Sequence, residues 1–392
     1  MVLTKRKYGL GIWALTFGYF AAYIPYSGLS KAVTSGLLNQ GPPVPVAEVL
    51  PSAALSTAAV VLLFITLMRW WRYGRKGSVY GLKFPFPRQQ TIISGIGFAT
   101  IILTTTLAYS FSGVSIILAL VLMRAGVLVM SPIIDRVFGR QVRWFSWSGL
   151  LISLAALAVS FSSIRSYTLS LSALLNLAAY LTGHAMRIPS MTRIAKTGPR
   201  DIAFNYFVEE QTVAMTVLVL VPVTLGLVGR GEIAHQFRYG LTHLFTPSIA
   251  SVGWAIGFFY AALGILLSFI YLDRRENTFC MSLFACSSLL SGIVASYLLM
   301  WWMNAPAPNA AQLTAALLII AALLIMSPLH HLPMYAKQLR DAIAEKRLRL
   351  VTLVHENPRS VPGADAPLAA SIVTIDLNSV RNILDGHKRN RG

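Results

Sequence analysis

The chain has 392 residues, of which 55% are hydrophobic and only 12% are charged. Several apolar runs of roughly 20 residues exclude a water-soluble globular class and indicate a polytopic helical membrane protein. A net charge of +19 would suggest nucleic-acid binding in a soluble domain. In a membrane protein it reflects where Lys and Arg collect, because cytoplasmic loops are enriched in them. We therefore expect membrane lipids as partners and no nucleic acid.

The apolar runs predict ten transmembrane helices. Their approximate ranges are 8–28, 46–68, 91–110, 113–132, 145–163, 168–186, 202–227, 247–272, 278–302 and 311–326. The first run follows a basic stretch, as in a signal peptide, but it lacks a small-x-small cleavage site, so we expect a retained span.

Basic residues alternate between the two sides of the predicted membrane. If the N-terminus is cytoplasmic, seventeen of them fall on the cytoplasmic side: Lys5, Arg6, Lys7, Arg69, Arg72, Arg75, Lys76, Lys83, Arg88, Arg136, Arg140, Arg143, Arg193, Lys196, Arg200, Arg274 and Arg275. The opposite side receives four: Lys31, Arg165, Arg230 and Arg238. One missed or invented span would scramble this pattern. We expect both termini in the cytoplasm, and the inner membrane as the location if the source is a bacterium.

One short stretch occurs twice, once in each half of the chain. Residues 19–36 and 180–198 each end an apolar run, pass through Ile-Pro and reach a lysine, Lys31 or Lys196, before a glycine. The two copies predict two five-helix repeats, 1–166 and 167–329, each with a span broken at its proline, Pro25 or Pro189. Because five is odd, the second repeat enters the membrane from the opposite side, so the repeats are inverted.

Charged residues beside the two copies are candidates for gating or charge balance. Lys31 and Glu48 would lie toward the outer face, and Lys196, Glu209 and Glu210 toward the inner face. Similar polar ends facing opposite compartments are what alternating access requires. The alternative is that these side chains only snorkel to the interface.

The layout resembles the drug/metabolite transporter superfamily, specifically its EamA-like repeats. The resemblance lies in the ten-span, five-plus-five arrangement, in the fourth and fifth spans (GVSIILALVLMRAGVLVMSPIIDRVFGRQVRWFSWSGLLISLAALAVS) and in the last two spans, and it covers about residues 8–328. It implies a transporter with a central cavity rather than an enzyme. Many such repeats carry an acid before their last span, whereas the corresponding loops here are FGRQVRW and NAPAPNAAQ.

Arg124 is the sharpest candidate for substrate binding. It falls at the middle of a predicted span, where an arginine costs roughly 3 kcal/mol on insertion unless it meets a watery cavity or an acid. We expect it to attract an anionic substrate. The alternative is a structural ion pair with Glu209 or Glu210.

Five further residues are assigned to substrate binding. His184 and Arg187 share a helix face just before Pro189 and would bind an anion or relay a proton, although Arg187 lies near enough to the interface to snorkel instead. Tyr19, Tyr23 and Tyr26 occupy neighbouring turns and would stack on the substrate, with core packing as the alternative.

The remaining features carry no chemistry of their own. Cys280 and Cys286 are interpreted as small core residues, and no metal or cofactor is expected. Residues 330–350 form a basic amphipathic segment expected on the inner leaflet, and residues 351–392 a mobile cytoplasmic tail.

Together these features predict an all-α membrane protein of ten helices. We expect a secondary transporter that moves a small polar, anionic metabolite, with a proton or a counter-substrate as the coupling partner. Two alternatives remain: a translocator of lipid or lipid-linked precursors on the same fold, and a membrane-embedded transferase. The transferase is disfavoured because the short loops contain no acid/base set.

Overall fold

The computed structural model describes residues 10–38, 43–79, 82–108, 116–162, 171–196, 199–246, 249–304 and 310–326. The chain separates into two units, Met1–Ser327 and Pro328–Gly392. The expected basic amphipathic segment and the mobile tail lie outside the described residues.

Among the described residues, ten long α-helices overlap the ten predicted runs. They are α1 (Leu10–Thr34), α2 (Val46–Leu67), α3 (Gln89–Leu107), α4 (Ile116–Val137), α5 (Trp144–Ser162), α6 (Leu171–Ile194), α7 (Arg200–Val228), α9 (Ile249–Leu272), α10 (Asn277–Met303) and α11 (Ala310–Met326). Judged on their described residues, five of them, α2, α3, α7, α9 and α10, are long and apolar enough to cross a membrane. The protein is therefore a helical, multi-pass membrane protein.

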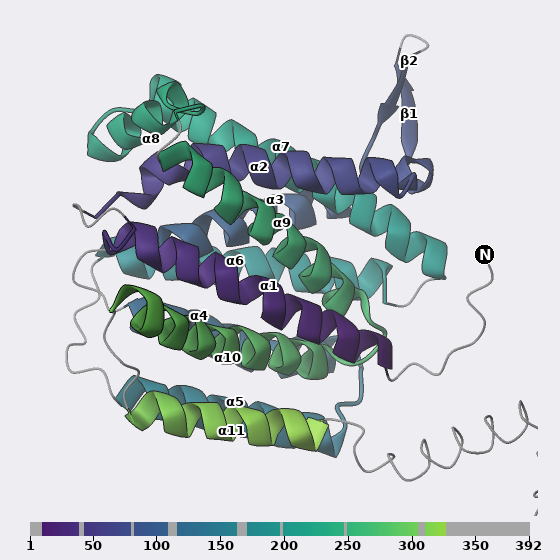
Figure 1. Ribbon diagram of the computed structural model, residues 1–392. Helices are drawn as coiled ribbons and strands as arrows, with labels where there is room; N and C mark the ends of the chain where they lie inside the picture. The colour runs from purple at the N-terminus through teal and green to yellow at the C-terminus, as the bar shows by residue number, and fades with distance from the viewer. Residues whose placement is uncertain are drawn as a thin grey trace, which may run out of the picture. The chain divides into compact units, whose positions relative to one another are not determined.

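Three elements in the connections were not predicted. A short 3₁₀ helix, η1 (Trp70–Tyr73), and a hairpin of β1 (Lys76–Val79) and β2 (Leu82–Pro85) join α2 to α3, with Lys76 paired to Pro85 and Val79 to Leu82. An amphipathic helix, α8 (Glu232–Thr242), joins α7 to α9. The hairpin and α8 lie at opposite ends of the helix bundle (Figure 1).

The expected breaks at Pro25 and Pro189 are wrong. Both prolines lie inside continuous helices, α1 and α6. A proline removes one backbone hydrogen bond, here to the carbonyl of Ala21 or Ala185. Unwinding the segment would expose several more backbone groups to apolar surroundings, each at a cost of several kcal/mol, so the helix continues.

The helices pack as an interleaved bundle (Figure 1). The most extensive contacts join α2 to α9, α3 to α6 and α7, α5 to α11, and α1 to α9 and α10. Helix α9 approaches α2 through Gly253 and Gly257. A Cβ added at Gly257 would lie 2.2 Å from the carbonyl oxygen of Ala53. At this close approach the Ser56 hydroxyl donates to the Trp254 carbonyl at 2.7 Å. Small residues spaced four apart allow such contact between helix backbones in membranes.

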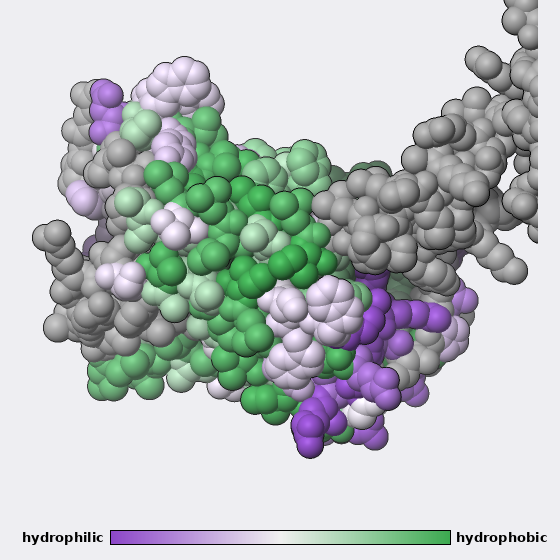
Figure 2. Space-filling view, turned by 90° about the horizontal axis from the view of Figure 1, so that it is seen from below, coloured by the Kyte–Doolittle hydropathy of each residue, from purple (hydrophilic) through white to green (hydrophobic). Residues whose placement is uncertain are grey.

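The face formed by α5 and α11 is largely apolar. Figure 2 shows a broad, mostly hydrophobic surface, with most of the strongly hydrophilic residues gathered at one end. Its exposed side chains include Leu151 of α5 and Leu317 of α11, 62% and 68% exposed, with Trp144 73% exposed at the start of α5. Apolar side chains bordered by tryptophan at a helix end are typical of a lipid-facing surface.

Candidate functional site

Arg124 lies in the interior of the helix bundle, with 4% of its surface exposed. Its guanidinium donates to the Tyr180 hydroxyl at 2.8 Å and to the Tyr23 hydroxyl at 3.1 Å, and it lies 4.2 Å from the ring centre of Phe284. Among the described residues no carboxylate pairs with it, so the alternative of an ion pair with Glu209 or Glu210 is wrong. Within the described part of the chain, the guanidinium contacts neutral hydroxyls and an aromatic face rather than an acid.

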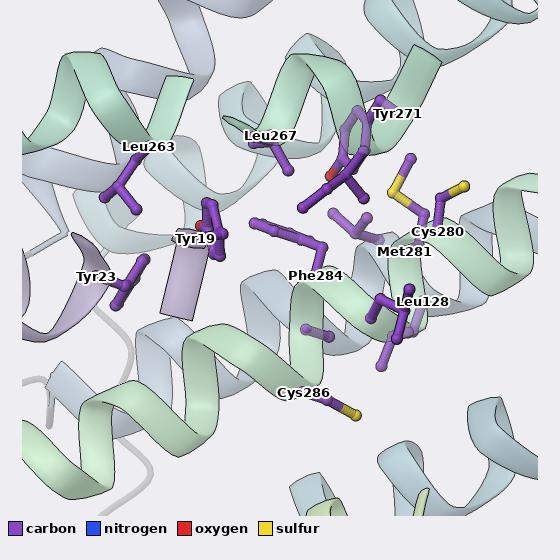
Figure 3. Close-up of a cluster of buried hydrophobic side chains, with 14 of the residues drawn as sticks. Tyr19, Tyr23, Leu128, Leu263, Leu267, Tyr271, Cys280, Met281, Phe284 and Cys286 are labelled. Carbon is purple, nitrogen blue, oxygen red and sulfur yellow. The ribbon is translucent and has the colours of Figure 1, made fainter. Parts of the chain in front are cut away.

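A small cavity borders this guanidinium. Helices α1, α3, α4, α9 and α10 line it, with Tyr19 and Tyr23 on one side and Phe284 beside Arg124. In Figure 3 the ring of Phe284 extends between Tyr19 and Tyr271. The free space is little more than one water molecule needs, so the cavity must widen before it accepts a metabolite.

Tyr26 does not line the cavity with the other two tyrosines of α1. Its ring is fully buried, 5.5 Å from that of Tyr23 and 4.9 Å from that of Tyr260. Both contacts are edge-on, the geometry that aromatic pairs favour. Tyr26 therefore supports the wall of the cavity from behind.

His184 lies one layer behind the cavity. It is fully buried, its ring is 4.7 Å from that of Tyr180 and 6.4 Å from those of Tyr271 and Phe284. Neither ring nitrogen has a hydrogen-bond partner among the described residues, and the Tyr271 hydroxyl has none either. Buried polar groups are almost always paired, so two neighbouring exceptions need an explanation.

Arg187 is engaged with an acid and does not face the cavity. It is fully buried, which contradicts the snorkelling alternative, and makes two hydrogen bonds of 2.9 Å to the Glu210 carboxylate. Ser268 accepts a further bond at 2.7 Å, while Ser94 and Tyr206 complete the shell around Glu210. This buried pair joins α6, α7, α9 and α3 into one polar cluster.

The other predicted charged residues have separate roles. Glu209 is buried and accepts hydrogen bonds from the Arg88 backbone N–H at 3.1 Å and the Thr91 hydroxyl at 2.8 Å, so it caps the start of α3. Lys31 and Glu48 are half-buried and form no ion pair within the described ranges.

Lys196 is buried just after α6. Its ammonium donates to the Arg275 carbonyl at 3.0 Å and lies 3.7 Å from the Cys280 sulfur. Burial lowers the pKa of this ammonium below its ordinary value. Cys280 and Cys286 are both free and buried, as expected of core residues.

A second polar cluster, which the sequence interpretation missed, fastens the start of α10. The buried Asp135 carboxylate of α4 accepts the backbone N–H groups of Asn277 at 2.9 Å and Thr278 at 2.7 Å, together with bonds from both side chains. Next to it, Arg143 makes a salt bridge of 2.9 Å with Glu276, which also accepts from Ser146.

We call this cluster the latch and define it as Asp135, Arg143, Glu276, Asn277 and Thr278. Burial alone would raise the pKa of the Glu276 carboxyl, but hydrogen bonds from Arg143 and Ser146 hold it below its usual range. Asn and Thr directly before an apolar run are a helix-start signal. That signal was present in the sequence, but its buried partner on another helix was not visible there.

Comparison with known proteins gives only a fold-level likeness. No protein-family model matches the sequence, and no curated protein matches it. The chain is similar to a solved structure described only as "Crystal structure of protein", with a TM-score of 0.50 at 13% sequence identity, over 81% of this chain and 97% of that chain. At this identity the likeness concerns the fold alone.

Proposed function

We propose that the protein is a secondary transporter that moves a small organic anion across the membrane by alternating access. The observation that carries this proposal is Arg124: a permanently charged side chain, buried beside a cavity, whose hydrogen bonds go to two tyrosine hydroxyls and to no described acid. A buried arginine left without a counter-charge costs roughly 3 kcal/mol or more. An anionic substrate would supply that counter-charge.

We further propose that the ten long helices form two inverted repeats, α1–α5 and α6–α11. Support comes from packing partners that exchange between the halves. Helix α1 packs on α9 and α10, and its counterpart α6 packs on α3 and α4; α2 packs on α9, and its counterpart α7 packs on α3. Three pairs of counterparts, α2 with α7, α4 with α10 and α5 with α11, contact each other directly. A two-fold axis that exchanges the halves would produce this pattern.

The connecting segments after α2 and α7 also pack on equivalent helices of the other proposed half. Trp70 of η1 packs on Phe207 near the start of α7 and on Phe269 near the end of α9, with ring centres 5.7 Å apart in both cases. Phe237 of α8 packs on Leu50 near the start of α2 and on the last turns of α3. Each repeat therefore inserts one aromatic side chain against the second helix of the other, at opposite ends of the bundle.

The latch gives the proposed transporter a closed end. Asp135 and Arg143 belong to the first proposed half, and Glu276, Asn277 and Thr278 to the second. From the seventeen-to-four charge asymmetry we infer that the helix end that carries the latch and the hairpin faces the cytoplasm. Opening toward the cytoplasm would then require these contacts between halves to separate.

Transport assays with an Arg124→Gln variant test the proposal. Purified protein in proteoliposomes should accumulate labelled monocarboxylates such as benzoate or lactate above protein-free liposomes. Arg124→Gln should fold, as judged by gel filtration and circular dichroism, and lose this uptake. The matched control is Arg136→Gln, because Arg136 is exposed and outside the cavity. Wild-type uptake no greater than that of empty liposomes, or full uptake by Arg124→Gln, would reject the proposal.

A further inference from the structure

Phe284 lies between the Arg124 guanidinium on one side and the polar groups of His184 and Tyr271 on the other. On one side the Phe284 ring covers the Arg124 guanidinium at 4.2 Å. On the other side its ring centre is 5.7 Å from that of Tyr271 and 6.4 Å from that of His184. Figure 3 shows Phe284 between Tyr19 and Tyr271, so a change of its rotamer would join the two sides.

The charges that line the cavity restrict the ligand. Arg124 is its one charged lining residue within the described part of the chain. A single guanidinium balances one negative charge. A phosphate dianion would keep one negative charge unbalanced in apolar surroundings. The ammonium group of a zwitterion would likewise be unbalanced, because no protein carboxylate lines the described part of the cavity.

The groups behind Phe284 add a second requirement. The His184 ring nitrogens and the Tyr271 hydroxyl are buried, adjacent and without hydrogen-bond partners among the described residues. Desolvating such groups without a partner costs about 1–3 kcal/mol each. A neutral hydroxyl on the ligand would pair with them, whereas an apolar ligand would leave them as they are.

We propose that Arg124, His184 and Tyr271 form one binding site, uncovered by Phe284, for a hydroxylated monocarboxylic acid with an apolar aryl or alkyl body. The carboxylate binds Arg124, the body lies against the aromatic rings of the cavity, and the ligand hydroxyl meets His184 and Tyr271. This inference rests on the proposed transport function and names its substrate class.

Four probes distinguish this class from its neighbours: 4-hydroxybenzoate, benzoate, L-tyrosine and phenyl phosphate. The readout is the ligand-dependent rise in melting temperature of the purified full chain, from which dissociation constants follow. We expect 4-hydroxybenzoate to bind about fivefold more tightly than benzoate, the value of one neutral hydrogen bond. Tyrosine and phenyl phosphate should bind more weakly than benzoate.

Variants assign the selectivity to individual side chains. Tyr271→Phe, which removes only the hydroxyl, should reduce the fivefold preference for 4-hydroxybenzoate, because His184 alone then pairs with the ligand hydroxyl, and should leave benzoate affinity unchanged. Tyr206→Phe is the matched control, because it removes a buried hydroxyl bound to Glu210 instead. Phe284→Ala should tighten binding of both probes, since no ring must move. If Tyr271→Phe fails to fold, His184→Phe, which removes both ring nitrogens, provides the same test.

The inference is overturned if no probe raises the melting temperature, if phenyl phosphate or tyrosine binds as tightly as benzoate, or if removal of the Tyr271 hydroxyl leaves the preference for 4-hydroxybenzoate undiminished. Arg124-dependent binding of phenyl phosphate alone would reject the substrate class and leave the transporter proposal standing. Selective binding of 4-hydroxybenzoate without uptake into proteoliposomes would support the site and reject transport.

Discussion

Removing the Asp135 carboxylate should unfasten the start of α10. Asp135 is fully buried and accepts four hydrogen bonds of 2.7 to 2.9 Å from Asn277 and Thr278, two of them from backbone N–H groups. Without the carboxylate, two buried backbone donors at a helix start lose their acceptor, at about 1–3 kcal/mol each. We therefore expect Asp135→Ala to favour latch opening by about 3 kcal/mol.

A native cysteine reports on this opening. Cys280 is buried one turn beyond Asn277, so it becomes accessible to a thiol reagent only when the start of α10 moves. In a Cys286→Ser background, the rate of alkylation of Cys280 by N-ethylmaleimide measures the open fraction. A change of about 3 kcal/mol corresponds to a rate increase of roughly a hundredfold.

The exposed Asp201, on the first turn of α7, provides the control. Asp201→Ala should leave the alkylation rate within about twofold of the parent protein, since surface substitutions change stability by about 0.5 kcal/mol or less. If Asp135→Ala and Asp201→Ala alkylate at the same rate, the latch does not hold this end closed and the energetic argument is wrong.

Two further predictions concern the ends of the bundle. Because the pKa of Glu276 is lowered in the folded state, its stabilising effect should be full above the pH at which a free glutamate titrates, roughly 4.3, and disappear as the pH falls through the folded value. At neutral pH, unfolding in mixed SDS micelles should show Glu276→Gln to be less stable than the parent protein by under about 1 kcal/mol, because Arg143 is 46% exposed and its charge is screened by solvent. This difference in stability should vanish in acid. A difference that stays constant across pH would contradict the assignment. A methyl group at Gly240 would lie 2.2 Å from the Glu48 carbonyl oxygen, so Gly240→Ala should destabilise the protein by about 1–3 kcal/mol. Gly292 has open space around it, so Gly292→Ala should be neutral or stabilising. Equal effects of the two substitutions on stability would refute the close packing of α8 on α2.

The candidate site was predicted in part from the sequence. Arg124 could be identified because a charge inside an apolar run is conspicuous whatever the fold. Arg187 was assigned to substrate binding, and its pairing with Glu210 could not be predicted, since it depends on how α6 and α7 are turned toward each other. The predicted helix breaks at Pro25 and Pro189 were wrong because a local rule was applied without its surroundings. Proline tends to end a helix, but this tendency is overridden where unwound backbone groups would be left without water to hydrogen-bond.

The sequence by itself determined the class of protein, the positions of the ten long helices and the burial of a cation among them. These depend on the length and composition of contiguous segments, which the aqueous and lipid phases sort one helix at a time. Tertiary structure decided which groups meet Arg124, which aromatic rings surround His184 and Tyr271, and how Asp135 fastens α10. The contacts of Arg124 with its tyrosines and of Asp135 with α10 join residues at least 56 positions apart, and they form only when whole helices pack with a definite rotation and depth.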